Sequence, residues 1–556
     1  MRKTLETDVL VLGSGIAGIS AAIYAAKTGA KVTIASSVHM FSGSTFYPGT
    51  WGLGLIGPEN EGDVENLIDT ILSLGKGVAV EPMVRTFVEN LNPTMDEFEA
   101  LGINLERPAK GTEGETEYIP CFDDKHRRWR GLTKKNLSEA LPKILRDLNI
   151  TPIPFFEAVE LIKVKGQVLG AVGIKDQKEV VTIKAKATVL CTGGLSGLYR
   201  RYLTTDDVSG TGLAMALKVG AKGINLEFTQ MMLGFVNPGA KTVHNEKTFK
   251  ASRFYNEKNQ EFLRGLLPDS ITLEEVLEKR SEHGPFSSET MSKYLDLGLY
   301  TEILGQKEKS ITLRYDESQL NQEADFVKTY FNWLKQEKSI EITDDIKIAP
   351  FMHASNGGIE INMKAETGIP GLYAAGEVTG GMHGADRVGG LSTANGLVFG
   401  KIAGINAGKF AHDLEIDLDS TETEFKPFYI EEAKEKIKVM RQLMDENSFL
   451  MRREDRLDHV LMELPKLITK IKDEGSVKEL RDTYHLYNGV ISAMALASVQ
   501  RMRKESRGSH FREDYPEHDE KLASPMQIGL KSILDDSKKI EEISFKIKQK
   551  NAGEEV

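Results

Sequence analysis

The sequence predicts an α/β fold: a Rossmann-like dinucleotide-binding domain, an α+β domain inserted into it, and a C-terminal helical domain. Three observations lead to this prediction. The chain opens on a strand, a glycine-rich turn and a helix, with the turn inside Val9–Gly18 (VLVLGSGIAG). A second glycine-rich segment, Gly371–Gly390, follows a long polar interval. From residue 425 onward, apolar residues recur at three- and four-residue spacing, which is typical of amphipathic helices.

The first glycine-rich segment predicts a binding turn for a dinucleotide. Asp8–Leu12 is predicted as a buried strand, and Ala30–Ala35 (AKVTIA) as the second strand of a βαβ unit. The helix between them, predicted over Ile19–Thr28, presents its positive N-terminal end to a pyrophosphate. The glycines suit a tight bend, a close approach of phosphate and close helix packing, so the whole turn is predicted to bind the cofactor: Gly13, Ser14, Gly15, Ile16, Ala17 and Gly18.

Two serines indicate which dinucleotide is bound. Ser36 and Ser37 follow the second strand, where a nicotinamide-binding site usually has an acid for the ribose hydroxyls. Their presence disfavours NAD, and both serines are predicted cofactor contacts. Together with the second glycine-rich segment, they favour a flavin nucleotide over a plain NAD-binding Rossmann protein.

Length and charge limit the class of protein. A chain of 556 residues is expected to form two to four domains. The formal charge of −11 disfavours a nucleic-acid surface. One basic run, Lys125–Arg130 (KHRRWR), is either a solvated turn or a group near an anionic substrate. No apolar run approaches the roughly 20 residues of a membrane span, so no direct span is predicted.

The chain has two cysteines, Cys121 and Cys191. Two thiols cannot supply the four ligands of an iron-sulfur cluster, and neither lies in a CxxCH haem motif, so no metal site is predicted. Cys191 falls in a predicted strand and is expected to be buried, whereas Cys121 is expected to be a free thiol in a loop. The cysteine usage, and the lack of room for a signal peptide before the first strand, predict a cytoplasmic location.

Changes of composition divide the chain into segments. The first part of the nucleotide-binding domain is predicted over residues 1–235 and its return over residues 351–412. The inserted domain is predicted over residues 236–350, which are richer in Lys and Glu. After an acidic linker, residues 425–556 are predicted to form the helical domain, with a charged tail that frays.

Particular elements are expected within these segments. Val159–Leu190 is predicted to form successive strands with glycine turns. The inserted domain is predicted to contain helices at Leu273–Arg280 and Glu323–Lys335. In the helical domain, amphipathic helices are predicted at Tyr429–Met444 and Asp455–Lys472.

Four separated motifs carry a resemblance to a known family. They are Gly43–Tyr47 (GSTFY), Thr188–Tyr199 (TVLCTGGLSGLY), Gly371–Arg387 and Glu505–Pro516 (ESRGSHFREDYP). In this order, they resemble the flavoproteins of succinate dehydrogenase, fumarate reductase and L-aspartate oxidase, and the match spans residues 8 to about 519. The resemblance implies an FAD-binding domain, a mobile capping domain that closes over the flavin, and a helical C-terminal domain.

The resemblance also implies further cofactor residues. It places the loop of Gly43, Ser44 and Thr45 beside the flavin ring, and Thr192, Gly193 and Gly194 on a strand-loop that returns to it. From the second glycine-rich segment it adds Gly376, Glu377, Arg387, Gly390 and Ser392. Membrane dehydrogenases of the family have a flavin-linking His where this chain has Ser44, and His39 is out of register, so the FAD is predicted to be non-covalent.

Three residues correspond to the family's substrate-binding positions. Arg387 matches an arginine that grips a substrate carboxylate, which a guanidinium can do in a planar, bidentate pair. A structural ion pair is the alternative for this residue. His383 and His353 match family histidines near the substrate, and the alternative for each is a packing role in a turn or in the core.

Several positions depart from the family pattern. Met232 stands where a substrate-binding His is expected, and a thioether cannot replace a carboxylate donor. Thr211 replaces an acid that contacts the flavin. Asp386 replaces an Asn next to Arg387, and a paired Asp386 and Arg387 would weaken the grip on a dicarboxylate.

The arginine that relays a proton in fumarate reductases has no clear counterpart. A rough alignment places Leu273 at its position. Arg253 and Arg264 lie nearby, and Arg280 is the candidate for a catalytic role. Without this relay, reversible reduction of an unsaturated dicarboxylate is less expected than oxidation of an amine or alcohol, or reduction of another activated alkene.

The sequence therefore predicts an FAD-dependent oxidoreductase that transfers hydride between a small carboxylate and the flavin, of the L-aspartate oxidase and fumarate reductase type. Electrons would leave through oxygen, a quinone, another soluble acceptor or a redox protein. The alternative is an electron-transfer or binding subunit in which the dicarboxylate site is changed or lost and a separate redox partner is needed.

Overall fold

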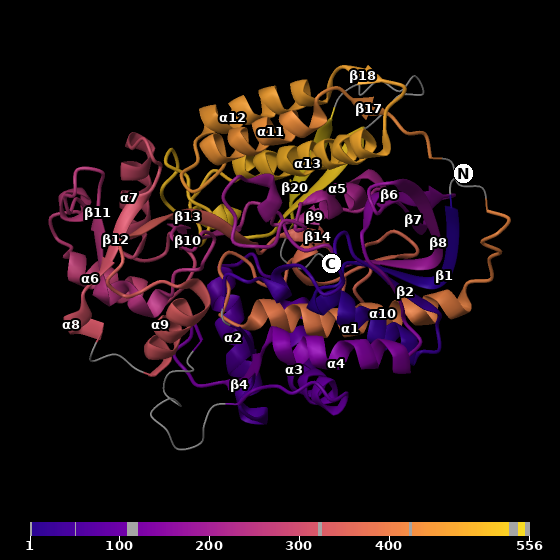
Figure 1. Cartoon of the computed structure of the whole chain (residues 1–556), viewed down its shortest axis with the longest axis horizontal. Helices are drawn as coiled ribbons and strands as arrows, with labels where there is room; N and C mark the ends of the chain where they lie inside the picture. Colours follow the sequence, from indigo (N-terminus) through magenta and orange to yellow (C-terminus); the bar gives the residue numbers. More distant parts are fainter. Residues whose placement is uncertain are drawn as a thin grey trace.

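The computed structural model describes residues 3–50, 52–107, 120–320, 325–421, 425–532 and 543–550. In this part of the chain the main sheet has seven strands in the order β5-β2-β1-β8-β7-β6, and β15 pairs with β8. The strands are β1 (Lys3–Leu12), β2 (Val32–Ala35), β5 (Thr151–Ile153), β6 (Phe156–Val164), β7 (Gln167–Lys175), β8 (Glu179–Leu190) and β15 (Leu372–Ala374). Figure 1 shows this sheet between the helices α1 and α10 and the C-terminal helices.

The sheet has a parallel centre and an antiparallel side. β1 runs parallel to β2 and β8, with Val9 opposite Val32 and Ala187. The last four residues of β1 are apolar and buried, as expected for a strand covered on both faces. β6, β7 and β8 form an antiparallel meander, which confirms the successive strands predicted for Val159–Leu190.

Two helices pack closely beneath the sheet. They are α1 (Ile16–Lys27) and α10 (Leu391–Asp413) (Figure 1). A Cβ atom built on Gly400 would lie 2.5 Å from the Ala17 carbonyl oxygen, and one on Gly404 would lie 2.2 Å from that of Ala21. Only glycine allows this approach of two backbones. It brings the start of α10 next to the start of α1, which begins three residues earlier than predicted.

Further elements cover the lower side of the nucleotide-binding domain. They are α2 (Val64–Gly75), α3 (Glu81–Ala100), α4 (Lys134–Asp147), and a ribbon of β3 (Leu53–Gly57) and β4 (Arg128–Leu132). The predicted basic run lies before and within β4. Its Arg127 is buried and pairs with Asp123 (2.8 Å) and Asp63 (2.5 Å). This arginine is therefore a packing residue, neither in a solvated turn nor at the site described below.

The inserted segment forms a separate capping body with its own apolar core (Figure 1, left). Its sheet has the order β10-β13-β12-β11. The strands are β10 (Thr229–Asn237), β11 (Ser252–Tyr255), β12 (Ile311–Tyr315) and β13 (Ile346–Ser355). The helices are α6 (Leu273–Arg280), α7 (Lys293–Gly305), α8 (Glu317–Leu320) and α9 (Asp325–Lys338). α6 has the predicted bounds, whereas Glu323, the predicted start of the second helix, lies outside the described residues.

Three long helices form the C-terminal layer: α11 (Ala433–Asn447), α12 (Glu454–Glu463) and α13 (Val477–Met502). The predicted helix limits are wrong at two points. Tyr429–Ile430 is a short strand, β17, which pairs with β18 (Ile471–Lys472). α12 ends at Glu463 because Pro465 cannot donate the next helical hydrogen bond, and a 3-10 turn follows.

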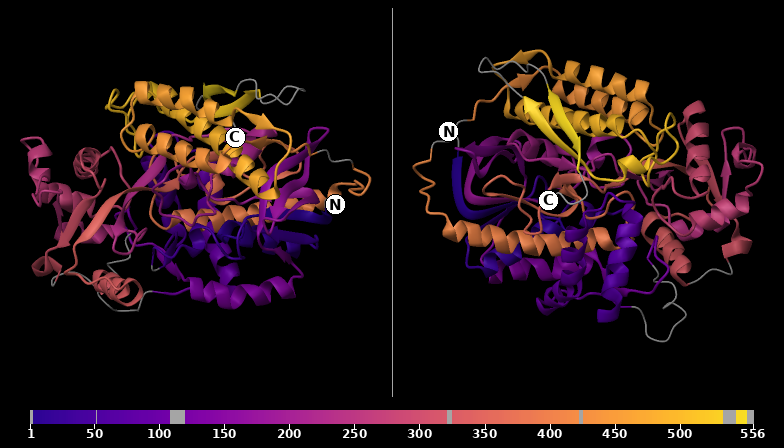
Figure 2. Two further views of the ribbon diagram at one scale, coloured as in Figure 1. Left: turned by 45° about the horizontal axis from the view of Figure 1, so that its top comes forward. Right: turned by 180° about the vertical axis from the view of Figure 1, so that it is seen from behind.

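The end of the chain also departs from the helical prediction. β19 (Met526–Ser532) and β20 (Ser544–Gln549) join β9 (Gly223–Ile224), β14 (Gly358–Glu360) and β16 (Thr379–Gly380) in a second sheet. Figure 2 (right) shows β19 and β20, in yellow, beside the C-terminal helices. The prediction that Lys538–Val556 frays is therefore wrong for residues 544–549, which form a paired strand, whereas residues 538–542 and 551–556 lie outside the described residues. Among the described residues, none of the helices combines the length and apolar character needed to cross a bilayer.

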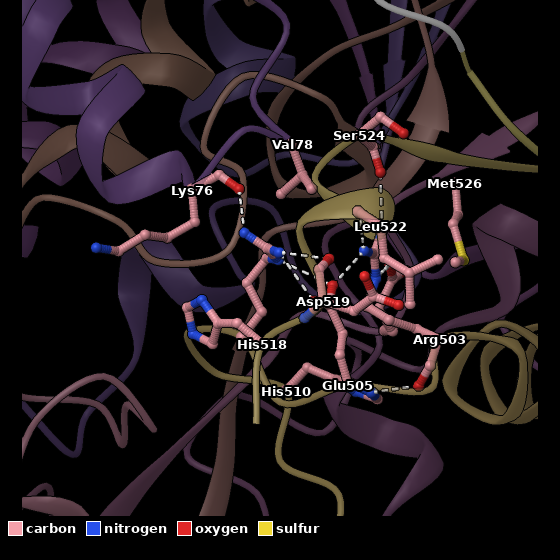
Figure 3. Close-up of polar contacts among 12 residues, drawn as sticks. Lys76, Val78, Arg503, Glu505, His510, His518, Asp519, Leu522, Ser524 and Met526 are labelled. Carbon is pink, nitrogen blue, oxygen red and sulfur yellow. Dashed lines mark hydrogen bonds and ion pairs between the residues drawn. The ribbon is translucent and has the colours of Figure 1, made fainter. Parts of the chain in front are cut away.

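A buried ionic network joins the C-terminal segment to the nucleotide-binding domain (Figure 3). Arg503 Nη1 donates to Glu505 Oε1 (2.8 Å), and Arg507 Nη2 donates to Glu505 Oε2 (2.8 Å). Arg503 Nε also donates to Glu227, which precedes β10. Arg507 Nη1 donates to the Lys76 carbonyl oxygen (2.7 Å) at the end of α2. Glu505 and Glu227 thus pair with two buried guanidinium groups that connect distant parts of the chain.

We expect Glu505→Gln to lower the free energy of unfolding by about 3–5 kcal/mol, because the buried Arg507 loses its carboxylate partner and Arg503 keeps only Glu227. The temperature of thermal unfolding measures this loss. Glu81→Gln is the matched control: it breaks an exposed pair with Arg85 and should change stability by less than about 1 kcal/mol. Equal effects of the two substitutions would contradict the assignment of the network as a stabilising junction.

Candidate active site

A cavity of about 510 Å³ lies where the sheet, the capping body and the C-terminal helices meet. This volume is within the range of small-molecule sites, about 300–1,000 Å³. Residues of both glycine-rich segments line it. The structure thereby brings together most of the predicted cofactor residues: Gly13, Ser14, Gly15, Ile16, Ala17, Ser36, Ser37, Gly43, Ser44, Thr45, Thr192, Gly193, Gly376, Glu377, Arg387, Gly390 and Ser392.

Gly18 and Gly194 are absent from this lining and support it from behind. A Cβ atom on Gly18 would lie 1.9 Å from the Gly13 carbonyl oxygen, so this glycine lets α1 approach the turn. A Cβ atom on Gly194 would lie 2.3 Å from Glu377 Oε1. Gly194 therefore leaves the space that the Glu377 side chain occupies.

Two helix N-termini face the cavity. Ile16 and Ala17 in the first turn of α1, and Ser392 and Thr393 in the first turn of α10, all line it. Ile16 N already donates to Thr45 Oγ1 (2.9 Å). The remaining amides and the positive ends of both helices favour negative charge, such as that of a diphosphate.

The polar groups of the lining fit a large polar ligand. Among the described residues, Ser44 Oγ, Thr192 Oγ1 and His353 Nδ1 are shielded and have no hydrogen-bond partner. Glu377 Oε1 accepts from Ser355 N (3.1 Å), and burial raises the pKa of this carboxyl. Because unpaired buried polar groups are unfavourable, these atoms are suited to the hydroxyl and ring groups of a flavin nucleotide.

Arg387 lies in the wall of the same cavity. Its Nε and Nη2 atoms donate to Gln230 Oε1, at 3.2 and 2.9 Å. Within the described part of the chain, no carboxylate lies within ion-pair distance of this guanidinium. Burial lowers the pKa of Arg387, and its remaining N–H groups are available for an anion.

Asp386 does not pair with its neighbour Arg387. It turns away from the cavity and its Oδ2 accepts from Ser287 Oγ of the capping body (2.6 Å). Burial raises the pKa of this carboxyl well above its usual range. Asp386 therefore connects the capping body to the loop that holds Arg387 and does not form an ion pair with Arg387, whose guanidinium interacts with the more distant Glu377 carboxyl.

The two predicted histidines have different surroundings. His353, on β13, lines the cavity, and burial together with the nearby Arg387 lowers its pKa to about 3. It is therefore neutral at physiological pH. His383 is buried outside the cavity lining, and burial likewise holds its pKa well below the usual range. Of the two, only His353 is placed to touch a ligand.

Two family models match this chain. The model described as FAD binding domain matches residues 8–393, and the model described as Fumarate reductase flavoprotein C-term matches residues 437–550. The chain belongs to the succinate dehydrogenase, fumarate reductase and L-aspartate oxidase family of flavoproteins. Its cofactor is FAD, and it is an FAD-dependent oxidoreductase, as the sequence predicted. The plain NAD-binding alternative is wrong.

Curated relatives match the flavoprotein over nearly its whole length. The flavoprotein is 27% identical to a fumarate reductase (CoM/CoB) subunit of Methanothermobacter marburgensis, over 92% of this chain and 95% of that protein. The L-aspartate oxidase of Halobacterium salinarum is 27% identical, covering 92% and 98%. Among solved structures, Mycobacterium smegmatis Sdh1 has a TM-score of 0.80 at 20% identity over 99% and 95% of the two chains. The quinol fumarate reductase flavoprotein of E. coli has a TM-score of 0.76 at 22% identity over 98% and 97%. These structures bear out the predicted fold class.

None of the three candidate relay arginines of the flavoprotein lines the cavity. Arg280 is fully buried, pairs with Asp296 (2.7 Å) and donates to the Gly284 carbonyl oxygen (2.8 Å). Gly284 does line the cavity, so Arg280 supports the wall from behind. Arg253 pairs with Asp316 and Arg264 with Glu274, away from the site. Leu273 is buried in the capping core.

The structure adds polar groups that sequence reasoning missed at the Arg387 end. Cys121 Sγ donates to Glu246 Oε1 (3.1 Å), and both residues line the cavity beside Met232 and Asn245. Cys121 is a free thiol, as predicted, and burial with the nearby Glu246 raises its pKa. No cation among the described residues lies within ion-pair distance of Glu246. The sequence gave no sign that Glu246 belongs to the site, because Glu246 stands in a polar stretch and only the fold of the capping body brings it to Cys121.

We expect Gly18→Ala to weaken FAD binding, because the added methyl group would displace α1 from the turn. Overpacking of this kind costs about 1–3 kcal/mol, which corresponds to a roughly 5- to 150-fold loss of affinity. The ratio of flavin to protein absorbance after purification, and a titration of the apoprotein with FAD, measure the effect. Gly265→Ala is the control, since a Cβ atom there meets nothing within 4 Å. Full retention of FAD by Gly18→Ala would contradict the assigned role of the turn.

Proposed function

We propose that this flavoprotein transfers hydride between non-covalent FAD and a small carboxylate that pairs with Arg387. The observation that carries the proposal is the guanidinium of Arg387, which lies in the cavity wall without a carboxylate partner among the described residues. A charge in such a place is unfavourable unless a ligand neutralises it. The cavity, together with an arginine that has no ion-pair partner among the described residues, favours a working substrate site over an emptied one.

Each side chain at this end has a defined task in the proposal. Gln230 accepts hydrogen bonds from one edge of the Arg387 guanidinium. The remaining N–H groups of the guanidinium are therefore oriented before the substrate arrives. Neutral His353 donates a hydrogen bond to the substrate without adding charge. The strands β10 and β13 of the capping body shield the site from water. The bound FAD supplies the hydride chemistry.

The charges at the Arg387 end favour an amino or hydroxy carboxylate over a dicarboxylate. A second carboxylate would need a second cation near Arg387. Among the described residues that line the cavity, the other arginine is Arg481, which lies on α13 and not on the capping body. A second carboxylate would instead meet the Glu246 carboxylate and the apolar Met232. An amine or hydroxyl of the substrate can donate to Glu246. We therefore favour oxidation of an amino or hydroxy monocarboxylate over oxidation of L-aspartate itself, which carries two carboxylates.

We also propose a separate electron acceptor, either a quinone or a redox protein. The relative from Methanothermobacter marburgensis is by name one subunit of a larger enzyme, and that from E. coli belongs to a quinol fumarate reductase. The alternative of an electron-transfer subunit differs in one respect: its flavin would be reduced only by a partner. A cytoplasmic location remains a prediction of the sequence.

Anaerobic titration tests the proposal directly. We expect the flavin absorbance of the holoenzyme to bleach with at least one member of a panel of amino and hydroxy carboxylates, and less readily with succinate. Arg387→Lys should bind FAD and require roughly 10- to 100-fold more substrate, because a bidentate charged pair is worth about 1.5–3 kcal/mol. Arg85→Lys, on the exposed surface, is the control. A flavin that stays oxidised with the whole panel, yet is reduced by an added redox partner, would overturn the proposal in favour of the electron-transfer subunit.

His353 should not contribute to the pH dependence of substrate binding between pH 5 and 8. Its pKa of about 3 lies below the ordinary value of about 6.5, so the folded protein keeps it neutral throughout this range. On unfolding it takes up a proton below about pH 6.5, so its contribution to stability falls as the pH drops towards 3. We expect wild type and His353→Asn to show parallel affinity profiles between pH 5 and 8. A transition near pH 6.5 in the wild type alone would contradict this.

A further inference from the structure

The cavity has a second end, opposite Arg387, and the residues that follow strand β2 indicate which part of FAD it would hold. Ser36 and Ser37 follow β2 and line the cavity. In dinucleotide-binding folds, the residue after the second strand meets the ribose of the adenosine half. Phe156 N donates to the Ser36 carbonyl oxygen (2.7 Å), which places β6 directly beside these serines. Phe156, Glu157 and Ala158 line the same end, which is therefore the adenosine end.

Two side chains of the C-terminal layer reach this end. Arg481 and His485 lie one turn apart on α13, and both line the cavity. Arg481 Nε donates to Glu157 Oε2 (2.6 Å), and His485 Nδ1 lies 3.6 Å from Glu157 Oε1. The arginine, the histidine and the β6 carboxylate thus form one cluster across the junction between two domains.

Features of this cluster fit a ligand. His485 Nε2 is shielded from solvent and has no hydrogen-bond partner among the described residues. The Arg481 side chain is 31% exposed and lines the cavity although its charge is paired. Burial raises the pKa of Glu157, but the hydrogen bonds of His485 and Arg481 and the charge of Arg481 outweigh it and lower the pKa, so this carboxyl is ionised. The cluster therefore offers donors, an acceptor and a flat cation together.

We propose that Arg481 and His485, oriented by Glu157, form part of the binding site for the adenosine half of FAD. Adenosine presents an exocyclic amine, ring nitrogens, ribose hydroxyls and an aromatic face, and each has a complement in this cluster. The C-terminal helical domain then binds the cofactor directly, through residues more than 300 positions away from β6 in the sequence. FAD connects the nucleotide-binding domain to α13, so the docking of α13 and the binding of FAD strengthen each other.

The proposal predicts a selective loss of affinity for the adenosine half. We expect His485→Leu and Arg481→Met each to weaken FAD and ADP binding to the apoprotein by about tenfold. Binding of FMN, which lacks adenosine, should change by less than about twofold. Flavin fluorescence reports FAD and FMN binding, and calorimetry reports ADP binding. None of these measurements depends on the substrate, so a failure here is distinct from a failure of the proposed oxidation.

Two controls separate direct contact from damage to the fold. Lys478→Met changes an exposed residue on the same helix and should leave all three affinities unchanged. His485→Asn keeps hydrogen-bonding groups and should recover most of the FAD affinity lost in His485→Leu. Equal weakening of FAD and FMN would show that α13 acts only through packing and would overturn the proposal. Unchanged FAD and ADP affinities in both variants would overturn it as well.

Discussion

The close packing of α1 against α10 is the constraint on which the cofactor site depends. Gly400 and Gly404 let one helix lie directly on the backbone of the other, and the two helices begin at the same cavity although they are separated by more than 360 residues. A larger side chain at these positions would separate the helices. Their positive ends would then no longer converge on one ligand.

Behind the site, the C-terminal segment stabilises the loop that presents Arg387. Ser509 Oγ donates to the Ala385 carbonyl oxygen (3.0 Å), and Gly508 N donates to Glu289 of the capping body (2.7 Å). The network around Glu505 anchors this segment to α2 and to the start of β10. The C-terminal segment, the capping body and α2, which are distant in sequence, therefore meet behind the guanidinium of Arg387. This arrangement explains why a helical domain far from the glycine-rich turns belongs to the functional unit.

The electrostatics of the cavity differ from end to end. At one end, Arg387 lies near a neutral histidine, a thiol and the Glu246 carboxylate. At the other, Arg481 is already paired with Glu157. An anionic substrate group is thus directed to Arg387, and the adenosine end is nearly neutral. The division suits a cofactor and a substrate that occupy one continuous space.

The sequence by itself determined the α/β class, the glycine-rich turns, FAD and the family, because these depend on local patterns: a strand, closely spaced glycines and a helix in fixed order. It also indicated Arg387 and His353 through motifs. Only the tertiary structure decided that Asp386 bonds to Ser287 and leaves Arg387 unpaired, and that His383 and Arg280 lie outside the cavity. It likewise brought Cys121 to Glu246 and His485 to Glu157, and paired β19 with β9. These contacts join residues far apart in the chain, and their formation depends on how whole domains pack, which no local spacing records.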